Sequence, residues 1–494
     1  MTVKQNFRTL LTLLIIFSPS AYGASVSRGD LISRTVADLA PGVVFEQNIE
    51  AGNAPLILNL LKVDLKRKGV RVLAGQANEI VSLKAPYNGR QTISAIARQK
   101  HALAAVNADF FPYTGDPLGL EIRNGELLSE SMDYRVCMGI SKGGAKFAVL
   151  TTLGSWSSRA LEGRLQGINR LPGASEVTLL TSSFSGETPL PRSMELIPVT
   201  GMNSPVKVSK EVAGVTEEGI TMRIGDILPH CKKNSAFLAI GSKADTALRE
   251  LTSPGEKISI LFDLTPTAPS PLLGKYESGL PASGESRSIV WNDVQEAVSG
   301  GPWLVKEGKL FVDGEAERMD QETFVRMRHP RTAVGITAKH LLLLVTTDGR
   351  SKWSRGASLI EMAQIMLRLG AVNAINLDGG GSTTMVVKDH VVNAPSDGLE
   401  RPVANGLLVF SGRGVASDEL PEVGAEERYI QQGVPTPLEL NMSASESKSL
   451  IWGTEHGFGF VSQSGVFQCD KPGSGIAFAV ASRRTYVFPI KVVP

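Results

Sequence analysis

The sequence is poor in the residues that build metal centres and covalent frameworks. Its 494 residues include only 3 cysteines and 6 histidines. The cysteines, Cys137, Cys231 and Cys469, lie far apart and match no zinc-binding or CxxC spacing, and no HExxH pair occurs. An oxidising compartment would allow one disulfide with one thiol left over, and three buried thiols are the alternative. The fold must therefore rest on its hydrophobic cores.

The sequence also lacks a charge bias and a long apolar run. It has 51 basic and 49 acidic residues, so it offers no electrostatic footprint for nucleic acid. Beyond the N-terminus, no apolar stretch approaches the length of a membrane span. These absences argue against nucleic acid as a partner and against integral membrane association.

The first two dozen residues have the pattern of a secretory signal peptide. Lys4 and Arg8 give a positively charged start, residues 10–17 form a compact apolar core, and residues 21–23 supply small side chains at the usual cleavage spacing. The apolar core is too short to favour an uncleaved anchor. The pattern predicts a cleavable signal peptide over residues 1–24 and a secreted or periplasmic protein.

Composition divides the rest of the chain into three regions. We predict an α+β catalytic domain with a mixed or antiparallel sheet, formed by residues 25–154 and 291–412. Residues 155–290 are rich in Ser, Pro and Gly and predict a mostly β insertion. Residues 413–494 show short strands without a convincing helix, which predicts a small C-terminal module resembling a β-sandwich.

Local signals predict individual hairpins and helices within the catalytic domain. Asn124-Gly125 and Glu307-Gly308 each separate two apolar-bearing runs, which is the pattern of a two-residue hairpin turn. Thr92 is placed to cap a helix in the segment TISAIARQK. Ser358 and Glu361 form a capping box for a helix in SLIEMAQIMLRLG.

Two apolar strands end in the same Asn-x-Asp pattern, each after a predicted helix. The first, AAVNADFF, carries Asn107 and Asp109, and the second, AVNAINLDGGGSTT, carries Asn376 and Asp378. Internal duplication and chance similarity are both compatible with this repeat.

Three consecutive glycines, Gly379 to Gly381, follow the second Asn-x-Asp. Their N–H groups can form an anion-binding nest, and the hydroxyl of Ser382 adds a donor. The segment is neither a P-loop nor a dinucleotide fingerprint, because the required spacings are absent. A glycine-rich turn that Asp378 merely caps is the alternative.

Arginines and acids accompany this motif elsewhere in the sequence. Arg331 enters a strand directly after a proline and is a candidate clamp for two anionic oxygens; Arg350 and Arg401 are weaker candidates. Asp109, Glu121 and Asp378 all stand at strand ends, where converging carboxylates would suit acid–base or nucleophilic chemistry. Nearby aromatic residues could form a sugar platform or pack in the core: Phe110, Phe111, Tyr113, Trp303 and Trp353.

Seven segments together resemble the phosphodiester glycosidase family, with their order intact. They are VNADFF, GDPLGLEIRNGEL, SGGPWLVKEGK, HPRTAVGI, LLLVTTDGR, GAVNAINLDGGGSTTM and RPVANGLLVF. The resemblance covers about residues 102–141 and 298–410, and the DGGGS and RTAVG segments are its most specific pair. The chain departs from the first motif in carrying Ala108, where glycine is frequent in the family.

The resemblance implies hydrolysis of a sugar-1-phosphodiester at the sugar carbon–oxygen bond, and bacterial members point to exopolysaccharide metabolism. The departing phosphate monoester has a second pKa of about 6 and needs little protonation. The site would therefore need positive charge and N–H donors at the phosphate, and a carboxylate near the anomeric carbon. Arg331 and the glycines would supply the first, and Asp378, Glu121 or Asp109 the second, as nucleophile or base. The residues implied to bind substrate are Asn107, Asn376, Thr332, Gly379, Gly380, Gly381, Ser382 and Trp353.

The sequence thus predicts that the two Asn-x-Asp strand ends form opposite walls of one cleft. Two other functions fit the same residues. One is a carbohydrate-binding protein of the envelope or an exopolysaccharide system without turnover, and the other is a metal-dependent phosphodiesterase that cleaves the P–O bond. We expect no cofactor and assign no metal ligands; a divalent cation held by the same acids is the alternative.

Overall fold

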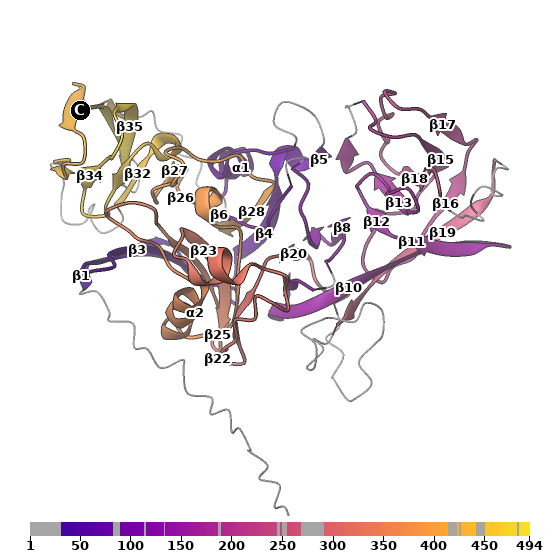
Figure 1. Cartoon of the computed structure of the whole chain (residues 1–494), viewed down its shortest axis with the longest axis horizontal. Helices are drawn as coiled ribbons and strands as arrows, with labels where there is room; N and C mark the ends of the chain where they lie inside the picture. Colours follow the sequence, from indigo (N-terminus) through magenta and orange to yellow (C-terminus); the bar gives the residue numbers. More distant parts are fainter. Residues whose placement is uncertain are drawn as a thin grey trace, which may run out of the picture.

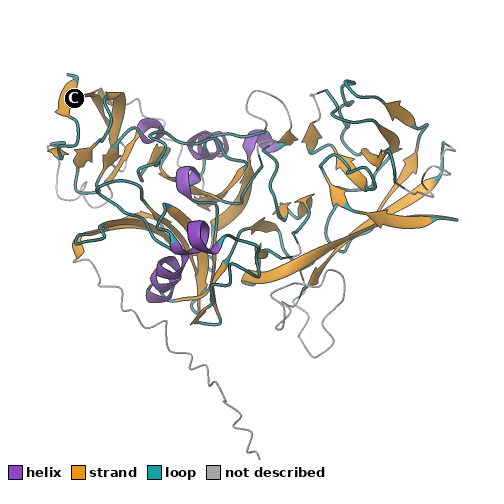
Figure 2. Cartoon of the chain, viewed as in Figure 1, coloured by secondary structure: helices purple, strands orange, loops and turns teal. Residues whose placement is uncertain are grey.

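The computed structural model of the chain is mostly β, with several sheets and few helices (Figure 2). It describes residues 31–82, 89–112, 115–132, 134–185, 189–244, 248, 254–267, 291–412, 422–423, 426–440, 450–481 and 484–494. The predicted signal peptide and Tyr113 lie outside these residues. The molecule is elongated, with the C-terminal strands at one end and the region around β15 to β18 at the other (Figure 1).

An eight-stranded antiparallel sheet forms one half of the central part. The loop that carries the three glycines follows β25 in this sheet. Its strands, in spatial order, are β1 (Leu31–Ala40), β2 (Val43–Glu50), β3 (Leu56–Asp64), β24 (Leu341–Thr347), β23 (Arg331–Thr337), β25 (Ala371–Asn376), β21 (Trp303–Lys306) and β22 (Lys309–Leu310).

A ten-stranded sheet forms the other half, and the first Asn-x-Asp stands at the end of its strand β6. Its order is β29 (Glu422–Val423), β36 (Thr485–Val493), β35 (Gly473–Val480), β32 (Ile451–Thr454), β27 (His390–Val391), β26 (Met385–Val387), β6 (Ala104–Asn107), β28 (Asn405–Ser411) and β4 (Val70–Gln76), with β30 (Arg428–Gln431) beside β36. One buried cluster joins the two sheets, with Val106 and Leu407 from this sheet and Val334 and Leu344 from the other. The two sheets therefore pack face to face.

One helix covers the outer face of each sheet. Helix α1 (Ile93–Lys100) buries Ile93 and Ile96 against the ten-stranded sheet. Helix α2 (Leu359–Arg368) buries Met362 and Met366 against the eight-stranded sheet. The central part is thus helix, sheet, sheet and helix, and its site lies where strand ends of the two sheets meet.

A third sheet extends from the central part towards the far end of the molecule. Its long strands β10 (Gly144–Ser158) and β19 (Lys257–Pro266) pair along most of their length (Figure 1). The other strands are β12 (Gly167–Ile168), β13 (Val177–Thr181), β18 (Ala236–Gly241), β15 (Met194–Thr200), β16 (Val212–Thr216), β9 (Val136–Ser141), β20 (Glu296–Ser299), β7 (Glu121–Arg123), β8 (Glu126–Ser129), β11 (Glu162–Leu165) and β17 (Ile220–Met222). The predicted insertion therefore shares this sheet with strands of the predicted catalytic domain.

The C-terminal strands are continuous with the ten-stranded sheet through a pair between Val391 of β27 and Thr454 of β32. They also have a core of their own, which includes Trp452, Phe467 and Phe488. The predicted module is thus joined to the central sheet by strand pairing. The smallest sheets are β5 (Val81–Ser82) with β14 (Phe184–Ser185), and β31 (Thr436–Pro437) with β34 (Val466–Gln468) and β33 (Phe460–Val461).

Several local predictions are confirmed. Asn124-Gly125 joins β7 to β8, and Glu307-Gly308 joins β21 to β22, with positive φ at all four residues. Thr92 Oγ1 accepts from the N–H of Ala95 at the start of α1. Ser358 and Glu361 form the predicted capping box of α2.

The structure also bears on disulfide formation and on membrane-spanning helices. Cys137 and Cys231 are buried free thiols, and Cys469 is a half-buried one. The disulfide considered from the sequence is therefore not formed. Among the helices of the described residues, none has both the length and the apolar character needed to cross a membrane.

Candidate functional site

The two Asn-x-Asp segments meet, although they belong to different sheets. The N–H of Asp378 donates to Ala108 O over 2.8 Å, and Asn107 Nδ2 donates to Asp378 O over 2.6 Å. The charge of Asp378 also raises the pKa of Asp109, so the two carboxyl groups are in electrostatic reach of each other. The strand ends are therefore adjacent, and that they form opposite walls of one cleft stays a prediction.

Both the Nδ2 and the Oδ1 of Asn107 form hydrogen bonds within the protein. Besides the bond to Asp378, its Oδ1 accepts from Thr332 Oγ1 at 2.8 Å and from the N–H of Thr384 at 3.1 Å. These bonds fix the glycine loop, residues 379–382, against the start of β23. Asn107 and Thr332 are thus positioning residues, and their contact with substrate stays a prediction.

Asn376 is engaged only in part. Its Nδ2 donates to Gly301 O at 2.9 Å and to Leu377 O at 2.7 Å. Its Oδ1 is buried without a partner among the described residues. The contact of Asn376 with substrate therefore stays a prediction.

The carboxyl groups of Asp109 and Asp378 differ in their surroundings. Asp109 is buried, and its oxygens accept from the N–H groups of Phe110 at 2.7 Å and Gly119 at 3.0 Å. Asp378 has a partly exposed side chain and bonds to Ser382. Burial of the carboxyl group raises the pKa of each to about 6. Asp378 is therefore the less buried residue of the two.

Glu121 is the third acid and is fully buried. Its Oε2 accepts from Asn405 Nδ2 at 2.9 Å, and its Oε1 has no partner in the described part of the chain. Asn405 Oδ1 in turn accepts from the N–H of Asp109 at 2.9 Å. Burial, and secondarily the charges of Asp109 and Glu296, raise the pKa of Glu121 to about 7. One amide thus connects two of the predicted acids.

Glu121→Gln should flatten the dependence of stability on pH. Because the folded state raises the pKa of Glu121 from 4.5 to about 7, it binds the proton more tightly than the unfolded state. This contribution to stability is therefore complete below pH 4.5 and is lost as the pH rises to 7. Glutamine stays neutral, so the fall in melting temperature between pH 4.5 and pH 8 should be smaller in the variant.

Calorimetry at several pH values checks this expectation, with Glu162→Gln on the exposed strand β11 as the matched control. Parallel melting curves for wild type and Glu121→Gln across the whole range would contradict it.

Each glycine of the loop lies against one arginine. A Cβ added to Gly379 would stand 3.7 Å from Arg331 Cδ, and one added to Gly380 would stand 3.1 Å from Arg350 Nη2. A Cβ on Gly381 would stand 2.2 Å from Arg401 Nη2. Gly380 also has a φ of +61°, which favours glycine. Three arginine side chains therefore lie beside the glycine loop: Arg331 from the start of β23, and Arg350 and Arg401 from loops.

Arg331 has a structural task that the sequence did not predict. Its Nε donates to Ala357 O at 2.9 Å, and its Nη2 donates to Phe324 O at 2.6 Å and to Met327 O at 3.0 Å. Burial, together with the charge of Arg350, lowers the pKa of Arg331 to about 10. Because Arg331 ties three loop carbonyls together, its removal would disturb the fold as well as an anion site.

Arg350 and Arg401 are less buried than Arg331. Arg350 Nη2 lies 3.3 Å from His329 Nδ1. Since His329 Nε2 bonds a carbonyl, Thr323 O, that nitrogen carries the proton and Nδ1 accepts from Arg350. Arg401 pairs with Asp397 and donates to Ser382 Oγ at 3.4 Å. The weaker candidates of the sequence are thus the more accessible ones.

Two of the aromatic residues near the site are partly exposed. The rings of Phe110 and Phe324 lie 6.0 Å apart, and the guanidinium of Arg331 stands 5.1 Å from the Phe324 ring. Trp303 belongs instead to the inter-sheet core. Trp353 is partly exposed beside Lys352, whose Nζ stands 4.6 Å from the ring, and its role in binding stays a prediction.

Three groups of the site were missed by sequence reasoning. Asn405 connects Asp109 to Glu121, and Arg135 lowers the pKa of both Asp109 and Asp378. Asp348 is buried, its pKa is raised to about 7 by burial, and its Oδ1 has no partner among the residues described. Asn405 and Asp348 stand in segments that were noted for Arg401 and Arg350, whereas Arg135 carries no local signal.

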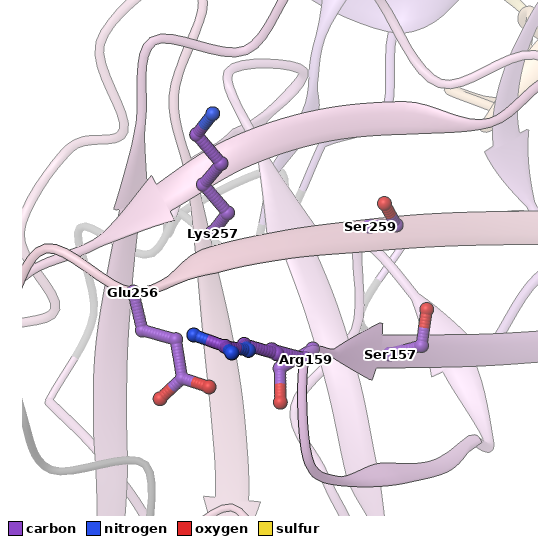
Figure 3. Close-up of a pocket in the computed structure, with 6 residues that line it drawn as sticks. Ser157, Arg159, Glu256, Lys257 and Ser259 are labelled. Atoms are coloured by element: carbon purple, nitrogen blue, oxygen red, sulfur yellow. The ribbon is translucent and has the colours of Figure 1, made fainter.

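Two further observations bear on where chemistry can occur. Within the described residues, no group of three or more His, Cys, Asp or Glu side chains is arranged to hold a metal ion. A surface hollow of about 520 Å³ lies on the ends of β10 and β19, lined by Ser157, Ser158, Arg159, Glu256, Lys257 and Ser259 (Figure 3). It contains a single acid, so it lacks the carboxylate pair of a glycosidase.

Residues 209–410 match the family model described as phosphodiester glycosidase. The human N-acetylglucosamine-1-phosphodiester alpha-N-acetylglucosaminidase is 40% identical over 114 residues, which are 22% of this chain and 22% of that protein. An uncharacterized SPbeta prophage-derived protein of Bacillus subtilis is 32% identical over 164 residues, 32% of this chain and 23% of that protein. The chain spans less than a quarter of the length of these relatives.

The crystal structure of a hypothetical protein from Synechocystis has the same fold. It superposes with a TM-score of 0.61 over 77% of this chain and 64% of that chain, at 18% sequence identity. The family match begins inside the predicted insertion, and it includes the glycine loop and all three surrounding arginines. Over these residues, the chain is similar to the phosphodiester glycosidase family.

Proposed function

We propose that the chain hydrolyses sugar-1-phosphodiesters at the bond between the anomeric carbon and the phosphate oxygen. The observation that carries the proposal is that Asp378 lies close both to Asp109 and to the glycine loop. Its carboxyl group stands beside Asp109, and the loop that follows it is surrounded by Arg331, Arg350 and Arg401. An acid and an anion-binding loop are thus supplied by consecutive residues.

The arginines and the glycine loop would stabilise the departing phosphate. Charge develops on the phosphate oxygens as the glycosidic bond breaks, and fixed N–H donors in a partly buried site stabilise that charge. Since the leaving phosphate has a second pKa of about 6, it departs without strong general acid catalysis. Arg350 and Arg401, whose side chains are more exposed than Arg331, are the natural contacts for it.

Asp378 is the best candidate for the carboxylate at the anomeric carbon. Asp109 has both oxygens bonded to backbone N–H groups, and Glu121 is wholly buried behind Asn405. Asp378 is partly exposed and precedes the loop directly. It would attack the anomeric carbon or activate a water, and the configuration of the released sugar separates these two roles.

Hydrolysis of a sugar-1-phospho-alkyl diester in oxygen-18 water tests the proposal. Label in the released sugar is expected, because the C–O bond breaks. Label in the phosphate would assign P–O cleavage and favour a phosphodiesterase. Absence of product with several sugars, N-acetylglucosamine among them, would favour a carbohydrate-binding protein.

The proposal includes the place of action, outside the cytoplasm. It rests on the signal-peptide pattern of residues 1–24. Sequencing of the mature N-terminus should find a chain that begins near Ala24, and a mature chain that retains Met1 would contradict it.

A further inference from the structure

Arg135, directly before β9, carries buried donors that the protein does not satisfy. The residue is partly exposed, but its Nε and Nη1 are buried and have no acceptor in the part of the chain that the structure describes. Leaving a charged donor buried without a partner is among the costlier defects of a folded protein. Such a group calls for an explanation, and a catalytic role or a bound water or ion is among the known ones.

The surroundings of Arg135 place these donors at the candidate site. Its guanidinium stands 4.7 Å from the ring of Phe110, the residue that follows Asp109. Its charge lowers the pKa of Asp109, Asp378 and Glu317. The charge of Arg135 therefore acts on two of the three predicted acids, Asp109 and Asp378, and on the buried Glu317.

Arg135 and Arg331 pack against different aromatic rings. The guanidinium of Arg135 lies against Phe110 and that of Arg331 against Phe324, and the two rings are 6.0 Å apart. The charges of Arg401 and Arg135 both act on Asp378. Asp378 is therefore influenced by an arginine of the glycine loop and by a second cation outside that loop.

We propose that Arg135 is a specificity determinant whose unpaired N–H groups donate to oxygen atoms of a neutral sugar, the one joined to the phosphate. This rests on the proposed function, because the phosphate occupies the glycine loop and the sugar must then extend past Asp378. A guanidinium has only donors, so it selects acceptors such as hydroxyl or amide carbonyl oxygens.

The charges around Arg135 favour a neutral sugar over an acidic one. The charge of Arg135 already acts on the carboxyl groups of Asp109, Asp378 and Glu317. A uronic acid would bring a fourth carboxylate into the same partly buried space, where like charges repel more strongly than in water. Hydroxyl oxygens accept the same N–H groups without adding charge.

Binding of uncleavable analogues to the full chain tests this inference. The probes are methyl phosphonate esters of N-acetylglucosamine in which a methylene group replaces the glycosidic oxygen. The series contains the parent, the 3-, 4- and 6-deoxy sugars, the 2-hydroxy sugar, and the uronic acid at C6. Affinities are measured by calorimetry for wild type, Arg135→Ala, Arg135→Lys and Arg318→Ala.

The expected result is coupling between one sugar oxygen and Arg135. Removal of that oxygen should weaken binding to wild type by about 10-fold or more, as for a charged hydrogen bond, and should have no further effect in Arg135→Ala. Arg135→Lys should recover part of the loss. Arg318→Ala is the matched control, because Arg318 stacks on the adjacent Tyr134 and should change affinity by less than about twofold.

Three outcomes would overturn the inference. They are equal losses for every deoxy sugar in wild type and Arg135→Ala, tighter binding of the uronic acid than of the parent, and no binding of any neutral probe. The test is separable from the proposed function. Coupling without hydrolysis of the cleavable diester would leave the inference standing and remove the function, and hydrolysis without coupling would do the reverse.

Discussion

Asp378→Asn should lower kcat by at least about 100-fold while leaving the fold intact. The substitution keeps the shape of the side chain and its contact with Ser382, but it removes the charge that would attack the anomeric carbon or activate water. Affinity for the uncleavable phosphonate should change little, because the arginines around the glycine loop remain. Steady-state kinetics on a sugar-1-phospho-alkyl diester measure the effect.

Asp293→Asn is the control for this prediction. Asp293 forms an ion pair with Lys146 and is more than half exposed. It is therefore an aspartate that lies outside the candidate site. Its kcat should equal that of wild type. A folded Asp378→Asn variant with near-normal kcat would remove Asp378 from the mechanism and favour Glu121, whose Oε1 has no partner among the described residues.

Features that depend on a few neighbouring residues could be predicted from the sequence. The Asn124-Gly125 and Glu307-Gly308 turns need positive φ at both positions, which glycine adopts freely and asparagine more readily than most residues. The capping box of α2 satisfies N–H groups that every helix leaves free at its start. The convergence of the two Asn-x-Asp ends was also predictable, because each pattern places polar groups at the end of a buried strand.

Features that depend on distant packing were not predictable. Arg331 was expected to face a phosphate, but three carbonyls from residues 324, 327 and 357 occupy two of its nitrogens, and only the fold brings them there. Arg135 is separated from Asp378 by more than two hundred residues and belongs to no recognisable pattern. Likewise, no local sequence pattern predicts that β32 pairs with β27. This pairing joins the C-terminal strands to the central sheet.

Gly381→Ala should raise KM by about 10- to 100-fold with little change in kcat or melting temperature. A Cβ at Gly381 would stand 2.2 Å from Arg401 Nη2 and 2.3 Å from Asp397 Oδ2, so these side chains must move. Both contacts are with the far ends of flexible side chains, which shift at low cost to stability. The displaced group is nevertheless an arginine of the proposed phosphate site, and an ionic hydrogen bond to the substrate is worth about 1.5–3 kcal/mol.

Gly219→Ala is the matched control, because its nearest neighbour would be Leu196 O at 3.8 Å and no side chain needs to move. Comparison of KM, kcat and melting temperature for the two variants separates loss of phosphate binding from loss of structure. If Gly381→Ala binds substrate normally, Arg401 does not hold the phosphate. If it lowers kcat with KM unchanged, Arg401 acts mainly on the charge that develops in the transition state, because an interaction gained only there leaves ground-state binding untouched.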